Sequence, residues 1–374
     1  MTDLYAQATD RYLRELTGAG LRPVLITHKW QRPDLIAPHS DLDLRLILSS
    51  TPPSWANYGD RLFRAHSRAV AADPLHARLL EHPPGFIFTT SELDAGLVQP
   101  AEVVTWSVAH GEHQLLEPWV KGAESAPWTT ADARFYGALL KSRIGGRYRL
   151  GDDSADNVTG DLADYARHCV AWHYVAPCWF AAACLSKRTR LQGKLEALVR
   201  WRPQDAARHA ELFSSHSSPA RSRPALPVDE LLRSAHAAVD AATRLIRPSD
   251  QTVPSEDPAT AAVRTWTMTA GMLRTKTARW RYYLTPPPGV HTNYLIAREA
   301  KELSSARDAL QGLALSGPVA HRGLAGAMAD LLPPQGTTTT ASTLRDLLTR
   351  WTVARSVVQD FLSGPITQVR NPNS

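Results

Sequence analysis

The chain has 374 residues, of which 43% are hydrophobic, and its formal net charge at pH 7 is +6. This length predicts two or three domains, and the hydrophobic fraction excludes a chain that is disordered throughout. The excess of basic residues favours anionic ligands such as phosphates. No run of about 18 apolar residues occurs, and residues 1–16 lack the basic-then-apolar order of a signal peptide. We therefore expect a cytoplasmic protein without a membrane segment.

The first 118 residues are predicted to alternate between helices and strands. Apolar positions recur with a helical period over 2–20 and 54–82. Two further short helices are expected within 91–118, where Ser91 and Pro100 interrupt the chain. Short apolar or alternating runs predict strands at 23–27, 41–48 and 85–90. These elements predict a small mixed sheet with helices around it.

Almost everything after residue 130 is predicted to be helical, including a segment at 203–214. The stretch 214–226 is rich in Ser, Pro and Arg, which is typical of a linker. A softer change of composition lies near 120–130. The expected fold class is α+β, with a small mixed-sheet N-terminal domain followed by mainly α-helical domains. The predicted domains are 1–125, 126–215 and 226–374.

The segment HSDLDLRLIL, residues 39–48, carries the most informative pattern. Residues two apart in a strand point to the same face, so Asp41 and Asp43 present two carboxylates together. Like charges this close repel each other unless a cation lies between them, and Mg²⁺ prefers carboxylate and phosphate oxygens. The alternative interpretation is an ordinary strand with an acidic outer face.

Pro38-His39-Ser40-Asp41-Leu42-Asp43-Leu44 resembles the P-H-S-D-x-D-hydrophobic segment of the nucleotidyltransferase superfamily, the DNA polymerase β-like fold, and in particular of the aminoglycoside adenylyltransferases. The segment 91–118 is similar to that family's link between its catalytic and helical domains, and the resemblance covers about residues 20–215. It implies that 1–125 is a catalytic domain and that 126–215 closes the cleft. It also implies that Asp41 and Asp43 bind Mg²⁺, with an NTP, expected to be ATP, as co-substrate.

The resemblance also implies a third carboxylate, and the sequence leaves two candidates open. Glu81 lies just before the predicted strand 85–90, and Glu92 lies just after it. Either residue is expected to act as a metal ligand or as a general base. The family's Gly-Ser pair after the first strand is replaced here by His28 and Lys29, so that backbone binding of a phosphate by a glycine turn is not expected.

Several residues are expected to bind the nucleotide. Lys194 follows Gly193 at a predicted helix start, where the resemblance implies a lysine that meets the phosphates. Lys187 lies in a small basic cluster with Arg188 and Arg190. The remaining candidates for nucleotide binding are Lys29 and Ser40.

The predicted function is Mg²⁺-dependent transfer of a nucleoside monophosphate from an NTP to a hydroxyl of a small-molecule acceptor. The acceptor would be an antibiotic, as in resistance, or a biosynthetic intermediate. The alternative is a catalytically degenerate protein of the same fold that binds a ligand or a partner. Nucleic acid is not the expected partner, because the arginines are scattered rather than clustered. The sequence leaves the oligomeric state open.

Overall fold

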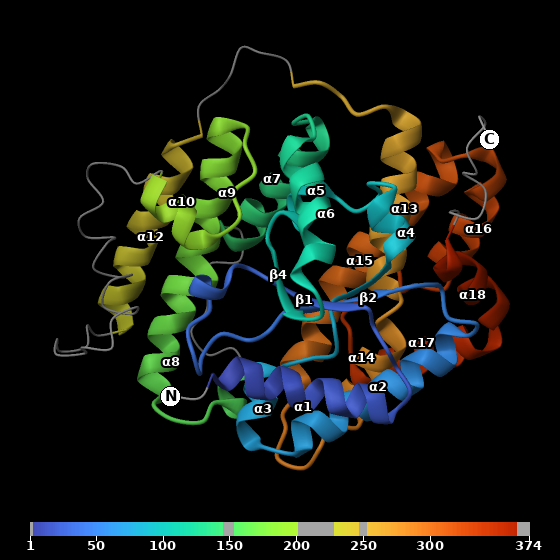
Figure 1. Cartoon of the computed structure of the whole chain (residues 1–374), viewed down its shortest axis with the longest axis horizontal. Coiled ribbons are helices and arrows are strands. Elements are labelled where there is room, and N and C mark those ends of the chain that lie inside the picture. Colours follow the sequence, from blue (N-terminus) through green and yellow to red (C-terminus); the bar gives the residue numbers. More distant parts are fainter. Residues whose placement is uncertain (1–2, 145–152, 201–227, 247–252, 365–374) are drawn as a thin grey trace.

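A computed structural model describes residues 3–144, 153–200, 228–246 and 253–364 (Figure 1). The predicted helix 203–214 and the predicted linker 214–226 lie outside the described residues. The described part is an α+β protein with a four-stranded mixed sheet and many helices, which confirms the coarse fold class. The helices after residue 130 lie on two sides of the sheet in Figure 1. The middle helices, within residues 130–246, lie mainly on the left, and the C-terminal helices, within residues 258–363, lie on the right.

The sheet has the strand order β3-β2-β1-β4. Strand β1 pairs antiparallel with β2 and with β4, whereas β2 pairs parallel with β3. The strands are β1 Leu25–Lys29, β2 Leu44–Leu48, β3 Phe86–Thr89 and β4 Trp106–His110. The prediction for 91–118 was wrong at β4, which is a strand where a helix was expected. Strand β4 forms because the free edge of β1 offers a hydrogen-bonding partner, which local sequence does not reveal.

Helices from the first 125 residues cover both faces of the sheet. The helices are α1 Leu4–Gly18, α2 Trp55–Ala71, α3 Pro74–Leu79, α4 Thr90–Asp94, α5 Pro100–Val103 and α6 His113–Ser125. Leu44, Leu46 and Leu48 belong to a core shared with α1 and α2. Ile47 and Phe88 point to the other face, into a core shared with α4, α5 and α6. The period-two alternation of β2 therefore places apolar side chains in both cores.

A middle group of helices forms a second unit with its own core. It comprises α7 Thr130–Ile144, α8 Leu162–His168, the π-helical segment Cys169–Val175, α9 Ala176–Lys187, α10 Lys194–Arg200 and α12 Val228–Arg244. The continuous helix over Leu162–Lys187 is long and apolar enough to cross a membrane, but 83% of its most apolar window is buried inside the protein. Ala235, Ala238 and Val239 of α12 pack in this core. Helix α12 lies within the range 226–374 that was predicted as the C-terminal domain, and its buried residues pack with the middle helices.

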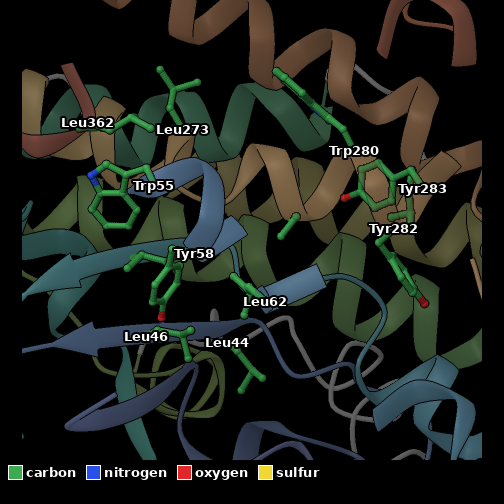
Figure 2. Packing of buried hydrophobic residues seen from close by; sticks show 14 of the residues in the cluster. Leu44, Leu46, Trp55, Tyr58, Leu62, Leu273, Trp280, Tyr282, Tyr283 and Leu362 are labelled. Carbon is green, nitrogen blue, oxygen red and sulfur yellow. The ribbon is translucent and has the colours of Figure 1, made fainter. Parts of the chain in front are cut away.

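The C-terminal helices share their core with the sheet domain rather than forming a separate one. They are α13 Pro258–Leu273, α14 Lys276–Leu284, α15 Asn293–Ser316, α16 Val319–Asp330, α17 Ala341–Val353 and α18 Arg355–Ser363. Figure 2 shows Leu46, Tyr58 and Leu62 packed in the same cluster as Leu273 and Trp280. Buried residues within the predicted domain 226–374 thus pack against the core of the sheet domain, a contact that the composition of the sequence does not reveal.

Helix α13 approaches β3 so closely that only a glycine fits at the contact. A Cβ atom at Gly271 would lie 2.4 Å from Cε1 of Phe88, which is far inside van der Waals contact. This close approach fixes the C-terminal helices against the edge strand of the sheet.

Candidate functional site

Charged side chains gather at one end of the sheet, where the carboxyl end of β1 meets the amino ends of the other three strands. Because β2 is antiparallel to β1 and parallel to β3, the segments that precede β2 and β3 meet the end of β1. The segment that precedes β4 reaches the same end, since Trp106 pairs with Lys29. The charged residues contributed by these segments are Lys29, Asp41, Asp43, Glu81, His82 and Glu102.

Asp41 and Asp43 lie in an extended segment immediately before β2. This is a small correction to the prediction, which placed them inside the strand. The backbone is nevertheless held as a continuation of the sheet: the Lys29 N–H donates to the carbonyl of Asp43 at 3.0 Å, and the Leu42 N–H donates to the carbonyl of Leu79 at 2.8 Å. The spacing of two therefore still places both carboxylates on the same side.

The carboxylates of Asp41 and Asp43 accept no hydrogen bond from the described residues. Their side chains are 20% and 40% exposed, and the nearest basic nitrogens of the described residues are Arg78 Nη2, 3.9 Å from Asp41, and His82 Nε2, 3.7 Å from Asp43. Buried acidic side chains elsewhere in the described residues all accept hydrogen bonds: Asp34, Glu81, Glu92, Glu102, Asp132 and Glu299. Unlike those buried acids, these two partly exposed carboxylates keep lone pairs available for solvent or for a ligand.

The two carboxylates have opposite pKa shifts. Burial, together with the charges of Glu81 and Asp43, raises the pKa of Asp41. Burial also acts to raise the pKa of Asp43, but Arg45, the neighbouring His82 ring and Lys29 together outweigh it and lower that pKa. The local charge therefore disfavours two free carboxylate anions side by side, and a bound cation would relieve the repulsion. An ion such as Mg²⁺ fits this donor set.

Of the two candidate third acids, the structure brings Glu81 to the cluster. One ligand atom each of Asp41, Glu81 and His82 lies within 4.8 Å of the others. The Glu81 carboxylate is already engaged, because it accepts hydrogen bonds from Tyr294 Oη at 2.8 Å, Arg78 at 3.1 Å and Arg298 at 3.3 Å. Burial acts to raise the pKa of Glu81, but the two guanidinium groups prevail and lower it.

Glu92 lies at the opposite end of β3, so the structure does not bring it to Asp41 and Asp43. Its side chain closes a capping box with Thr89 at the start of α4. Both of its carboxylate oxygens also accept hydrogen bonds from Arg274, each at 2.8 Å, and both side chains of this ion pair are fully buried. Glu92 therefore fastens the C-terminal helices to the sheet.

Lys29 reaches the site, although not from a loop after β1 as predicted. His28 and Lys29 are the last two residues of β1, and the Lys29 Nζ atom lies 3.4 Å from Glu102. Burial lowers the pKa of His28 to about 4, so this imidazole is neutral at pH 7. The next residue, Trp30, has φ of 75°, a left-handed conformation that ordinarily favours glycine. The turn after β1 thus keeps a glycine-like backbone without a glycine, and such outliers cluster at functional sites.

Ser40 and Lys187 are placed less favourably for a nucleotide. The Ser40 hydroxyl is buried, accepts a hydrogen bond from the Ile36 N–H at 3.1 Å and lies 3.2 Å from His168 Nε2. It therefore joins the segment before β2 to α8. Lys187 is exposed at the end of α9. Its predicted neighbour Arg190 is bound to Asp132 at 2.6 Å, which ties the segment after α9 to α7.

Lys194, which was predicted to bind phosphate, interacts electrostatically with Asp41 and Asp43. It is buried at the first position of α10, and its Nζ atom lies over the rings of Trp30, at 4.9 Å, and Trp172, at 5.2 Å. Burial lowers the pKa of Lys194 to about 8, while Asp34, Asp41 and Asp43 oppose that shift. The first N–H groups of α10 already have a hydrogen-bond acceptor within the protein, because the Asp34 carboxylate accepts hydrogen bonds from the N–H groups of residues 194 and 195.

Sequence reasoning missed several residues of this site. Arg78 and His82 flank Glu81 in the sequence, and that local density of charge could have drawn attention to them. Asp34 gives no such signal, since its role depends on α10. Tyr294 and Arg298 come from α15, more than 200 residues away from Glu81, and no local pattern connects them to it.

Comparison of the chain with protein-family models, with curated proteins and with solved structures finds no match. The fold and the site therefore define only a broad class of protein. It is an α+β protein with a four-stranded mixed sheet, in which acidic, basic and imidazole side chains meet at one end of the sheet. Any finer assignment has to be argued from the geometry of that cluster.

Proposed function

We propose that this protein transfers a nucleoside monophosphate from a metal-bound NTP to a hydroxyl group of a small-molecule acceptor. The observation that carries the proposal is the pair Asp41 and Asp43, two partly buried carboxylates at the end of a mixed sheet that accept no hydrogen bond from the part of the chain the structure describes. The D-x-D segment in that position, with an antiparallel strand on one side and a parallel strand on the other, supports the resemblance to nucleotidyltransferases.

Asp41 and Asp43 are the residues that would hold the cation. When bound, a divalent ion neutralises triphosphate charge and favours in-line attack at phosphorus. Lys194 supplies a positive charge on the side of the middle helices, close enough to both aspartates to interact with them electrostatically. Lys29 supplies a second positive charge at the end of β1. Most of the rate would come from positioning and charge neutralisation.

Glu81 is suited to positioning rather than to proton abstraction. Its two oxygens accept hydrogen bonds from two arginines and a tyrosine, and its pKa is lowered. A weakly basic carboxylate with its lone pairs in use is a poor general base. Its role is to hold Arg78 and Arg298 beside the cluster, which sets the charge that a bound triphosphate would meet.

The test is calorimetric titration of the wild-type protein with each of the four NTPs, with and without Mg²⁺. We expect one NTP to bind only when the metal is present, because the carboxylates and the triphosphate repel each other without it. Release of pyrophosphate in the presence of a panel of amino sugars and other polyols would then identify the acceptor class. If no NTP binds under either condition, the proposal fails.

A catalytically degenerate binding protein is the second candidate. It is favoured by one observation, the hydrogen bonds that Glu81 accepts from Arg78, Tyr294 and Arg298, which make this carboxylate a weak general base. This candidate predicts metal-dependent NTP binding without pyrophosphate release for any acceptor. Pyrophosphate release above the rate of the Asp41→Asn/Asp43→Asn variant would exclude it.

Lys194 gives a pH-dependent prediction. Its pKa of about 8 means that the ammonium group loses its proton as the pH rises from 7 to 9, whereas an ordinary lysine stays charged. We expect NTP affinity to fall about tenfold over this range, since the neutral amine no longer attracts a phosphate. Lys194→Met should weaken binding about 10- to 100-fold at pH 7, the cost of losing a charge-assisted hydrogen bond.

Lys194→Arg is the matched control for that prediction, because a guanidinium stays charged throughout the range. Charged groups that interact with Lys194 are Asp34, Asp41, Asp43 and Arg143, and none of the aspartates titrates between pH 7 and 9 when unperturbed. Calorimetry at several pH values should show that the NTP affinity of the wild type falls from pH 7 to 9, whereas the NTP affinity of Lys194→Arg stays constant. An equal slope for both would assign the pH dependence to another group.

A further inference from the structure

His82 is the one imidazole of the acidic cluster, and its ring is fixed by the backbone. The side chain is 6% exposed, and Nδ1 lies 2.7 Å from the carbonyl oxygen of Pro83. A carbonyl oxygen can only accept, so Nδ1 carries the proton and donates to it. In the neutral ring, Nε2 is then left with its lone pair. The tautomer is therefore set by a neighbouring residue in the chain.

The Nε2 atom of His82 points at the carboxylates. It makes no hydrogen bond with any residue that the structure describes, and it lies 3.7 Å from an oxygen of Asp43, beyond hydrogen-bonding distance. His82 also belongs, with Asp41 and Glu81, to a group of residues that each have one potential ligand atom within 4.8 Å of the others. A histidine whose Nδ1–H bonds to a backbone carbonyl while Nε2 faces carboxylates has the arrangement that supports metal ligation.

The carboxylates of the cluster differ in how many of their oxygen lone pairs are free to bind a metal ion. Glu81 accepts hydrogen bonds from Arg78, Tyr294 and Arg298, so its oxygens are already in use. Asp41 and Asp43 accept none from the described residues. The donor set that remains open is thus two carboxylates and one imidazole nitrogen.

A protonated His82 acting only as a counter-cation is the competing explanation. The cluster does not need another cation for that purpose, because Arg78 and Arg298 flank Glu81, and Arg45 and Lys29 lie beside Asp43. An ion pair would also be expected to close to hydrogen-bonding distance, which the separation of 3.7 Å does not reach.

We propose that His82 is a direct ligand, through Nε2, of a divalent transition-metal ion held together with Asp41 and Asp43, and that the site binds such an ion more tightly than Mg²⁺. Imidazole is a good ligand for Zn²⁺ and other first-row ions, whereas Mg²⁺ prefers oxygen and keeps its waters. The expected order of affinity is Zn²⁺ above Mn²⁺ above Mg²⁺. The inference rests on the metal site of the proposed function and does not require that an NTP is turned over.

The test uses the full chain and Mn²⁺ alone, followed by electron paramagnetic resonance. Wild type should bind Mn²⁺ at least tenfold more tightly than Mg²⁺, measured by competition, and pulsed spectra should show coupling to an imidazole ¹⁴N nucleus. His82→Gln should lose that coupling and bind Mn²⁺ about 10- to 100-fold more weakly. His113→Gln, an exposed histidine on α6, is the matched control and should match the wild type.

A second variant separates loss of a ligand from loss of folding. His82→Asp replaces the nitrogen ligand with oxygen, so it should restore metal binding while shifting the preference toward Mg²⁺. Wild-type Mn²⁺ binding without ¹⁴N coupling, or unchanged affinity in His82→Gln, would overturn the inference, as would the absence of any metal binding. ¹⁴N-coupled Mn²⁺ with no NTP binding would support the inference while refuting the proposed transfer. Metal-dependent NTP binding without ¹⁴N coupling would support the metal-bound NTP of the proposed function while refuting His82 as a metal ligand.

Discussion

Replacing Asp41 and Asp43 together by asparagine is expected to remove metal-dependent NTP binding, with a loss of affinity of at least about 100-fold. The two carboxylates are the cluster's acidic groups that accept no hydrogen bonds from the described residues, so they are the oxygens free to hold a cation. An amide keeps the shape of each side chain but removes both negative charges. Calorimetric titration with NTP and metal measures the loss directly.

The same double variant should fold about as well as the wild type. Burial and the charges of Glu81 and Asp43 raise the pKa of Asp41, so neutralising Asp41 removes an unfavourable interaction, whereas neutralising Asp43 loses the attraction to basic groups that lowers its pKa. The two effects oppose each other, so we expect a thermal midpoint close to that of the wild type. Asp330→Asn, an exposed aspartate at the end of α16, is the matched control and should leave binding unchanged. A double variant that binds as tightly as the wild type would refute the site.

Glu92→Gln is expected to lower the free energy of unfolding by about 3–5 kcal/mol, because it leaves the charge of Arg274 buried without its anionic partner. Arg274 is fully buried and also donates hydrogen bonds to the carbonyls of Ile87, at 3.1 Å, and Leu362, at 2.8 Å. The ion pair therefore joins β3 and α4 to the C-terminal helices. Urea denaturation of wild type and variant gives the difference.

Metal binding should be unaffected in Glu92→Gln under conditions where the variant remains folded, because Glu92 lies at the far end of β3 from Asp41 and Asp43. Unchanged metal binding in Glu92→Gln would show that Glu92 stabilises the fold and does not bind the metal ion. Replacing both partners, Glu92→Leu with Arg274→Met, should recover part of the lost stability, since removing a whole buried pair costs less than breaking one. A Glu92→Gln variant that is fully stable but has lost metal binding would show that the third-acid assignment belongs to Glu92 after all.

Local sequence determined the elements whose pattern is contained within a few residues. The strand around Leu44 and Leu46 follows from period-two alternation, and the helices after residue 130 follow from their 3.6-residue period. The pairing of Asp41 with Asp43 depends only on extended backbone, so it holds although both residues lie just before β2. The start of α10 at Lys194 was likewise predicted, because a glycine precedes it.

Only the tertiary structure decided the partners of those elements. Strand β4 exists because β1 offers it a free edge, and the parallel pairing of β2 with β3 places Glu81, rather than Glu92, beside Asp41. Tyr294 reaches the same carboxylate from α15, because the C-terminal helices share a core with the sheet. Such contacts depend on which apolar faces meet across hundreds of residues, and a local pattern carries no information about that choice.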